Sequence, residues 1–433
     1  MKLHIFQSAK GDCLLLEAKD GTRILCDGGM AASMRTHVRD ELAKLREAGK
    51  KIDYVYISHI DQDHISGALQ LLEDELEWRL FDFHTEQGTP IREPKVPRPP
   101  EIGGIWHNAF RDQIGKNVGE IEDMLAAAAP TLLASAVPKI VELGEELQQI
   151  AVSIPEAIKV SRYASAELLN IPTNQLPGSH EKPKLLMVRD GQTAFDVGSM
   201  QLTIVGPTSD ELKLLQKGWN NFLRDAKGKE QIKKLRAEIK RKIEAFGSET
   251  FDLRDWNGIE DYKGVTTPNI ASLMFMVEED SKRLLLTGDS QQDIIIKGLE
   301  LTGFLDAGHL HLDVLKTQHH ASEHNFNPAF CRKVSADNYV FCGNGSNGNP
   351  ELSVIQMIYD SRLGPKAKRA LAPEADGRKF KFWFSTTSDM QAEESLQREN
   401  FSKVEKLVDK LIEKSNGQLT AVFNDDVSIT LKI

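Results

Sequence analysis

Residues 54–67, YVYISHIDQDHISG, constrain the fold of this chain more than any other stretch. Tyr54–Ile57 is short, uncharged and rich in β-branched and aromatic residues, which is typical of a buried strand. Directly after it come four side chains that can bind metals, namely His59, Asp61, Asp63 and His64. A helical pattern begins at Ile65 and is expected to end near Glu77, before a strand-like run, Trp78–Phe83. The sequence therefore predicts a strand, a polar turn and a helix in series.

The polar turn has two explanations. Asp63 and Ser66 are good N-cap residues, so part of the turn would serve to cap the helix. Capping accounts for one carboxylate and leaves both histidines and Asp61 unexplained. Hard carboxylate oxygens together with neutral imidazoles suit zinc, manganese or iron. We therefore interpret the turn as part of a metal site.

Two later segments lead to the same kinds of side chain. Arg283–Thr287 is a predicted strand that leads to Asp289, where a carboxylate can bridge two metals. Asp313–Thr317 is another, and it leads to the adjacent histidines His319 and His320. Because consecutive side chains at a strand end point in different directions, we expect at most one of these histidines to bind the metal.

The composition limits the classes of function. The chain has 433 residues and a formal net charge of −10, which argues against a broad nucleic-acid-binding surface but is compatible with a local basic groove. The first residues lack the long apolar core of a signal peptide, and the least polar run, 125–137, is too short to cross a bilayer. Four scattered cysteines without CxxC spacing are typical of reduced core residues. These features predict a cytoplasmic protein without a membrane segment.

Two stretches interrupt the predicted strands. Residues 101–184 change to a helical pattern after a proline-rich loop, and we interpret them as a helical insertion that forms a lid or an interface for a protein partner. Residues 208–262 are charged and helical, either a solvated hairpin or a basic arm that faces the substrate. A second basic segment, 366–381, makes Lys368 and Arg369 candidate contacts for the phosphates of a substrate.

The turn at residues 59–64 resembles the HxHxDH motif of the metallo-β-lactamase superfamily, with Asp61 in place of the second histidine. In the longer form SHxDxDHxxG it is similar to the branch that includes the hydrolase domain of the bacterial DNA-uptake competence protein. Other motifs of this branch stand in the expected order at residues 11–12 (GD), 27–29 (DGG), 287–289 (TGD) and 319–322 (HHAS). The resemblance implies an α/β fold, the four-layer αβ/βα metallo-β-lactamase sandwich, with residues 1–433 as a single domain that carries the two helical insertions.

The resemblance also implies roles for individual residues. The metal ligands are His59 and Asp61 for one ion, Asp63, His64 and His319 for the other, and Asp289 as the bridge. The catalytic residues are Asp63 and His320, with His320 as a proton donor or phosphate contact. The substrate-binding positions are Asn269, Ser322 and Asn349, the last of which stands where relatives often have a histidine. Gly206 and Pro207 stand where many superfamily members carry a third metal-binding histidine.

The activity implied by the resemblance is metal-dependent hydrolysis of phosphodiester bonds, by a nuclease or phosphodiesterase. One or two divalent metal ions, zinc or manganese, would activate water and polarise a phosphoryl oxygen. Asp61 in place of a histidine and the missing third histidine add hard oxygen character, which shifts the preference towards manganese or magnesium relative to an all-histidine site and leaves zinc compatible with it. The acidic balance of the chain favours a single-stranded nucleic acid or a small nucleotide as the substrate, or delivery of the substrate by a partner protein.

Two other functions are compatible with the sequence. A carboxyl-ester or lactone hydrolase would use the same metals, with an apolar pocket and an activity that does not fall with salt. A catalytically weak interaction module would use the helical insertion as its binding surface and need hold no metal. The missing third histidine and Asn349 favour the module.

Overall fold

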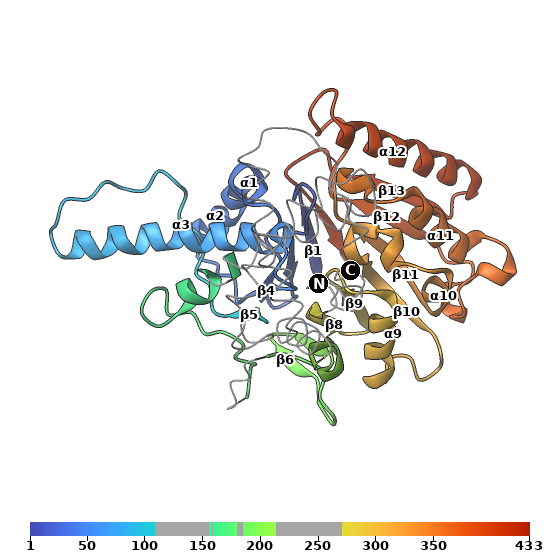
Figure 1. Cartoon of the computed structure of the whole chain (residues 1–433), viewed down its shortest axis with the longest axis horizontal. Coiled ribbons are helices and arrows are strands. Elements are labelled where there is room, and N and C mark those ends of the chain that lie inside the picture. The colour runs from blue at the N-terminus through green and yellow to red at the C-terminus, as the bar shows by residue number, and fades with distance from the viewer. Residues whose placement is uncertain (109–155, 158, 180–184, 214–270) are drawn as a thin grey trace, which may run out of the picture.

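The computed structural model describes residues 1–108, 156–157, 159–179, 185–213 and 271–433. Within them, two β-sheets pack face to face, and helices cover the outer face of each sheet (Figure 1). Asn269 and most of the two predicted insertions lie outside these residues. None of the helices in the described ranges is long and apolar enough to cross a membrane.

The first sheet has six strands in the order β14-β1-β2-β3-β4-β5. Their bounds are β1 Lys2–Phe6, β2 Leu14–Glu17, β3 Arg23–Cys26, β4 Tyr54–Ile57, β5 Ile105–His107 and β14 Ser428–Lys432. The pairs β3–β4 and β4–β5 are parallel. The carboxyl ends of these three strands therefore lie at one edge of the sheet. β5 falls within the range predicted for the first insertion, yet it is a strand of this sheet.

The second sheet has eight strands in the order β13-β12-β11-β10-β9-β8-β7-β6. Their bounds are β6 Phe195–Val197, β7 Met200–Gly206, β8 Met274–Glu279, β9 Lys282–Leu286, β10 Leu310–Lys316, β11 Val334–Phe341, β12 Phe380–Phe384 and β13 Leu419–Phe423. Strands β9 to β13 are parallel to one another, so the loops that follow them lie along one edge.

Helices of the first half of the chain cover the first sheet, and helices of the second half cover the second (Figure 1). Their bounds are α1 Ala31–Ser33, η1 Met34–Val38, α2 Arg39–Glu47, α3 Gln62–Glu86, α9 Gln292–Leu301, α10 Pro328–Lys333, α11 Leu352–Leu363 and α12 Leu396–Lys414. The predicted strand at Trp78–Phe83 is wrong, because α3 continues through it to Glu86. The segment that follows α3 packs on this part of the helix. Trp78 Nε1 donates to the carbonyl of Val96 at 3.0 Å, and the guanidinium of Arg98 lies over the Trp78 ring.

Alternation of side chains along the strands separates three apolar layers. In β4, Val55 and Ile57 pack under α2 and α3, whereas Tyr56 points between the sheets, where its ring meets Phe275. In β9, Leu285 packs beneath the helices that cover the second sheet. A layer of helices, two sheets and a second layer of helices thus confirm the predicted α/β class and agree with a metallo-β-lactamase sandwich.

Candidate metal centre

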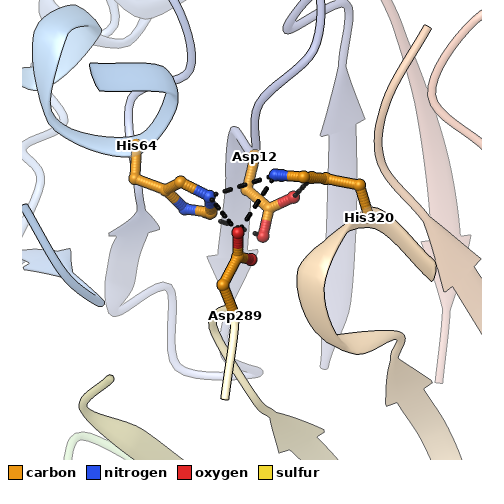
Figure 2. Close-up of side chains that lie close together, drawn as sticks. All are labelled: Asp12, His64, Asp289 and His320. Carbon is orange, nitrogen blue, oxygen red and sulfur yellow. Dashed lines mark hydrogen bonds and ion pairs between the residues drawn. The ribbon is translucent and has the colours of Figure 1, made fainter. Parts of the chain in front are cut away.

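Four buried side chains from distant parts of the chain converge at the carboxyl edge of the parallel strands (Figure 2). They are Asp12 from the β1–β2 connection, His64 from the first turn of α3, Asp289 after β9 and His320 after β10. The two sheets each contribute to the cluster because both end their parallel strands at this edge. The resulting constellation combines imidazole nitrogens with carboxylate oxygens.

The Nε2 atoms of two histidines face the same point. His64 Nε2 lies 3.3 Å from His320 Nε2, and each lies 3.2 Å from Asp289 Oδ2. Asp63 Oδ2 lies 3.5 Å from His320 Nε2. Ligand atoms about 2.0–2.1 Å from a zinc ion lie roughly 3.3 Å apart at the corners of a tetrahedron. The two Nε2 atoms and Asp289 Oδ2 therefore have the spacing of a metal coordination shell, and Asp63 Oδ2 lies beside them.

A second group lies beside the first. His59 Nε2 lies 3.5 Å from Asp61 Oδ2 and 3.9 Å from Asp289 Oδ2. His59 is buried, and its Nε2 has no hydrogen-bond partner among the described residues. Leaving a buried nitrogen unpaired costs free energy, and a bound cation would satisfy it. Asp289 Oδ2 is common to both groups, so this carboxylate would be the shared ligand if each group held an ion.

Two further carboxylates orient the histidines. Asp27, after β3, accepts hydrogen bonds from the backbone N–H and the hydroxyl of Ser58 at 2.7 and 2.8 Å, and its Oδ2 lies 2.9 Å from His64 Nδ1. Asp12 Oδ1 lies 3.1 Å from His320 Nδ1. A carboxylate at Nδ1 fixes the ring and turns Nε2 towards the metal position. The geometry therefore makes Asp27 and Asp12 orienting residues for His64 and His320.

A buried lysine lies beneath the cluster. The ammonium of Lys316, the last residue of β10, contacts the carboxylate of Asp12, donates to the carbonyl of Gly288 at 3.1 Å and lies 3.6 Å from Asp289 Oδ1. Burial opposes ionisation of Asp12, but Lys316 and His320 outweigh it and lower the pKa of that carboxyl to about 2. Burial likewise opposes the charge of Lys316, yet Asp12 and Asp289 raise the pKa of its ammonium above the usual value. Both groups of this pair are therefore charged.

The buried groups carry a surplus of negative charge. Five carboxylates lie in or beside the cluster: Asp12, Asp27, Asp61, Asp63 and Asp289. The Lys316 ammonium compensates one of them. Imidazoles that bind a metal are neutral, so in the metal-bound protein two divalent cations would balance the other four carboxylates. Burial opposes ionisation of Asp289, but His320, His64 and His319 hold the pKa of that carboxyl well below its usual range. Because uncompensated buried charge is costly, the donor set fits divalent metal ions.

The turn after β10 determines which histidine reaches the cluster. His319, His320 and Ala321 have φ values of 45°, 50° and 63°, a left-handed conformation that costs about 1–2 kcal/mol for each residue. Hydrogen bonds hold the turn, including His319 N–H to the Gly288 carbonyl at 3.3 Å and the Asn325 amide to the Asp289 carbonyl at 3.2 Å. Backbone strain of this kind is found at functional sites, where the surrounding structure maintains it.

The strained turn puts the two histidines in different positions. His320 is buried, with Nε2 in the cluster, whereas His319 lies at the rim with 29% of its side chain exposed. His319 Nε2 lies 3.9 Å from Asp289 Oδ2, and its Nδ1 is hydrogen-bonded to Asn325 Oδ1 at 2.7 Å. The sequence-based assignment gave His319 the ligand role and His320 the proton-donor role, while the geometry favours His320 as the ligand.

The predicted substrate contacts are separated in space. Ser322 is buried beside the histidine turn, and its N–H donates to the His319 carbonyl at 2.9 Å. Asn349 follows β11, and a side chain added at Gly343 would meet both the His320 side chain and the Asn349 backbone, so Asn349 lies close to the cluster.

Lys368 and Arg369 lie elsewhere. They follow the C-terminal end of α11 and pair with Asp360 and Asp376 at 2.8 and 3.7 Å. Arg362, near the same end of α11, contacts the carbonyl of Ala336 in the first half of β11. This end of α11 therefore lies near the start of the strand, whereas the cluster lies beyond the carboxyl ends of the parallel strands. The structure does not bring these two cations to the cluster.

Three residues of the centre were not among the sequence-based site predictions. Asp12 and Asp27 were visible only as members of the GD and DGG motifs. Lys316 is only weakly indicated by the sequence, as the single lysine of the strand LHLDVLK, which stands at the end of that strand and directly before Thr317. A charged residue at an otherwise apolar strand end is expected to have a buried partner.

Part of the chain matches a known protein family. Residues 9–75 match the family model described as "Metallo-beta-lactamase superfamily", and this range includes Asp12, Asp27 and the residues 59–64. No curated protein matches the chain. Among solved structures, Zn(2+)-bound PqqB from Methylobacterium extorquens is 12% identical, with all of both chains covered and a TM-score of 0.31. That TM-score by itself establishes neither a shared fold nor a shared reaction. The family match supports the superfamily and does not extend to the competence-protein branch.

Proposed function

We propose that this protein is a metal-dependent hydrolase of phosphodiester bonds. The observation that carries the proposal is that Asp289 Oδ2 is shared by two groups of donors, one with His59 and Asp61 and the other with His64 and His320. Two ions held in this way suit phosphodiester cleavage, since the attacking and leaving oxygens can both be stabilised. When bound, zinc or manganese ions would lower the pKa of a water molecule and polarise a phosphoryl oxygen.

The protein side chains have distinct parts in this reaction. The carboxylates of Asp27 and Asp12 hold the imidazoles of His64 and His320 with Nε2 towards the ions. Asp63 completes the second group of ligands. His319, partly exposed at the rim, is placed to contact a substrate oxygen or to donate a proton to the leaving group.

The substrate that we propose is a small nucleotide or a short single-stranded nucleic acid in the cytoplasm. A long duplex would need many cations along its path, and Lys368 and Arg369 pair with carboxylates away from the cluster. We also propose that a partner protein binds the helical insertion, residues 101–184.

The test combines metal analysis with a simple substrate. Protein purified without chelator should contain zinc or manganese and hydrolyse bis-p-nitrophenyl phosphate. Asp289→Ala should lose both bound metal and hydrolysis, whereas Asp360→Ala, which removes a carboxylate that pairs with Lys368 away from the cluster, should keep both. Hydrolysis by Asp289→Ala at the wild-type rate would refute the proposal. A protein that takes up no metal even on reconstitution would instead favour the interaction module.

A further inference from the structure

The loop between β1 and β2 lies directly against the metal centre. A Cβ atom added at Gly11 would lie 1.7 Å from the carbonyl oxygen of Asp63, so the two backbones are in contact there. The loop is closed by the Ser8 hydroxyl, which donates to the Gly11 carbonyl at 2.6 Å, and by the Gly11 N–H, which donates to the Ser8 carbonyl at 3.2 Å. Lys10 belongs to this loop and is therefore held beside Asp63.

Lys10 differs from the other lysine of the centre. Lys316 is fully buried and its charge is taken up by Asp12. Lys10 is half-buried, and its ammonium has no carboxylate within ion-pair distance among the described residues.

Metal binding would change the net charge of the site beside Lys10. Two divalent ions would balance the carboxylates that Lys316 leaves uncompensated, and the charge of Lys10 would then be in excess beside the site. A phosphodiester carries one negative charge, which matches this excess. A carboxyl ester or a lactone is neutral at the reacting group before attack, so a cation there contributes less to the binding of such a substrate than to the binding of an anion.

We propose that Lys10 is the substrate contact that recognises the negative charge of a phosphodiester and disfavours neutral esters. This inference rests on the proposed function, because it assumes that divalent ions fill the centre. It names a residue that selects the substrate class without binding metal.

The experiment measures anion binding as well as turnover. Inorganic phosphate is titrated into the metal-loaded wild-type protein, Lys10→Gln, Lys10→Arg and the control Lys19→Gln by calorimetry. Lys19 is an exposed lysine of the next turn, and it pairs with Asp280. Lys10→Gln should weaken phosphate binding by about tenfold or more, the usual effect of removing a hydrogen bond to a charged group. Lys10→Arg should retain most of the affinity, and Lys19→Gln should bind as the wild type does.

Kinetics separate this role from a structural one. Lys10→Gln should raise KM for bis-p-nitrophenyl phosphate with little change in kcat, and should leave any hydrolysis of neutral p-nitrophenyl acetate unchanged. Equal phosphate affinity of Lys10→Gln and the wild type, or no binding by the metal-loaded wild type, would overturn the inference. If phosphate binding depends on Lys10 but the wild type cleaves no diester, the proposed reaction is wrong and Lys10 is still the anion contact.

Discussion

Replacing Lys316 by methionine should destabilise the protein strongly. Methionine has nearly the same length but no charge, so the substitution leaves the carboxylate of Asp12 and Asp289 Oδ1, both buried, without their ammonium partner. The Gly288 carbonyl also loses a donor at 3.1 Å. Breaking a buried ion pair by removing one partner costs about 3–5 kcal/mol. We expect that loss in the free energy of unfolding of the metal-free protein.

The assay is urea denaturation in the presence of a chelator, with Lys282→Met as the matched control. Lys282 pairs with Asp313 at 2.7 Å on a neighbouring strand, but 44% of the Lys282 side chain is exposed. An exposed pair of this kind contributes about 0–1 kcal/mol. The two variants therefore compare the same pair of residue types in buried and exposed surroundings.

A double variant tests the cause of the loss. Asp12→Asn combined with Lys316→Met removes both charges of the pair, and it should recover part of the stability that Lys316→Met loses. The reasoning is refuted if Lys316→Met and Lys282→Met differ by less than about 1 kcal/mol, because the burial of the pair would then have no energetic consequence.

Three further predictions concern the metal centre and the core. His320→Ala should lose bound metal, whereas His319→Ala should keep the metal and lose turnover. If four ligands share the roughly 10–16 kcal/mol of a zinc site, the metal affinity of His320→Ala should fall by about a hundredfold or more. Metal analysis of both variants is the test, and the opposite pattern would restore the sequence-based assignment. Asp27→Asn should weaken metal binding by about 10–100-fold without loss of any ligand, as measured by competition with a chelator; unchanged affinity would show that Asp27 only holds the Ser58 turn. Burial lowers the pKa of His107 from its ordinary value of 6.5 to about 4. Between pH 6.5 and pH 4 the unfolded chain therefore binds a proton at this histidine and the folded chain does not. The free energy of unfolding should fall by about 1.4 kcal/mol for each pH unit over this range. His107→Phe should remove this slope, as urea denaturation at pH 7 and pH 5 would show, and an equal slope in both proteins would contradict the assignment.

Local patterns were sufficient for the parts of the site that lie close together in the chain. Tyr54–Ile57 was predicted and found as a strand, and the side chains His59, Asp61 and His64 follow it directly. Asp289 was expected at the end of a strand and stands there, after β9. A strand end and its loop depend on residues within a few positions of one another, so sequence alone could place them.

Local patterns failed where contacts with distant chain segments decided the outcome. The aromatic run Trp78–Phe83 has the composition of a strand, but Val96 and Arg98 pack on Trp78 and it remains part of α3. Tertiary contacts override a weak local preference when a neighbouring segment covers the residues concerned.

The sequence by itself determined the residue types of the centre, their order along the chain and their place after strands. Only the tertiary structure decided which of them meet. Asp12 and Lys316 are far apart in the chain and touch because β1–β2 and β10 end at the same edge of the two sheets. The choice between His319 and His320 depends on three left-handed backbone residues, and their cost is met by hydrogen bonds to segments that the strand pattern does not include.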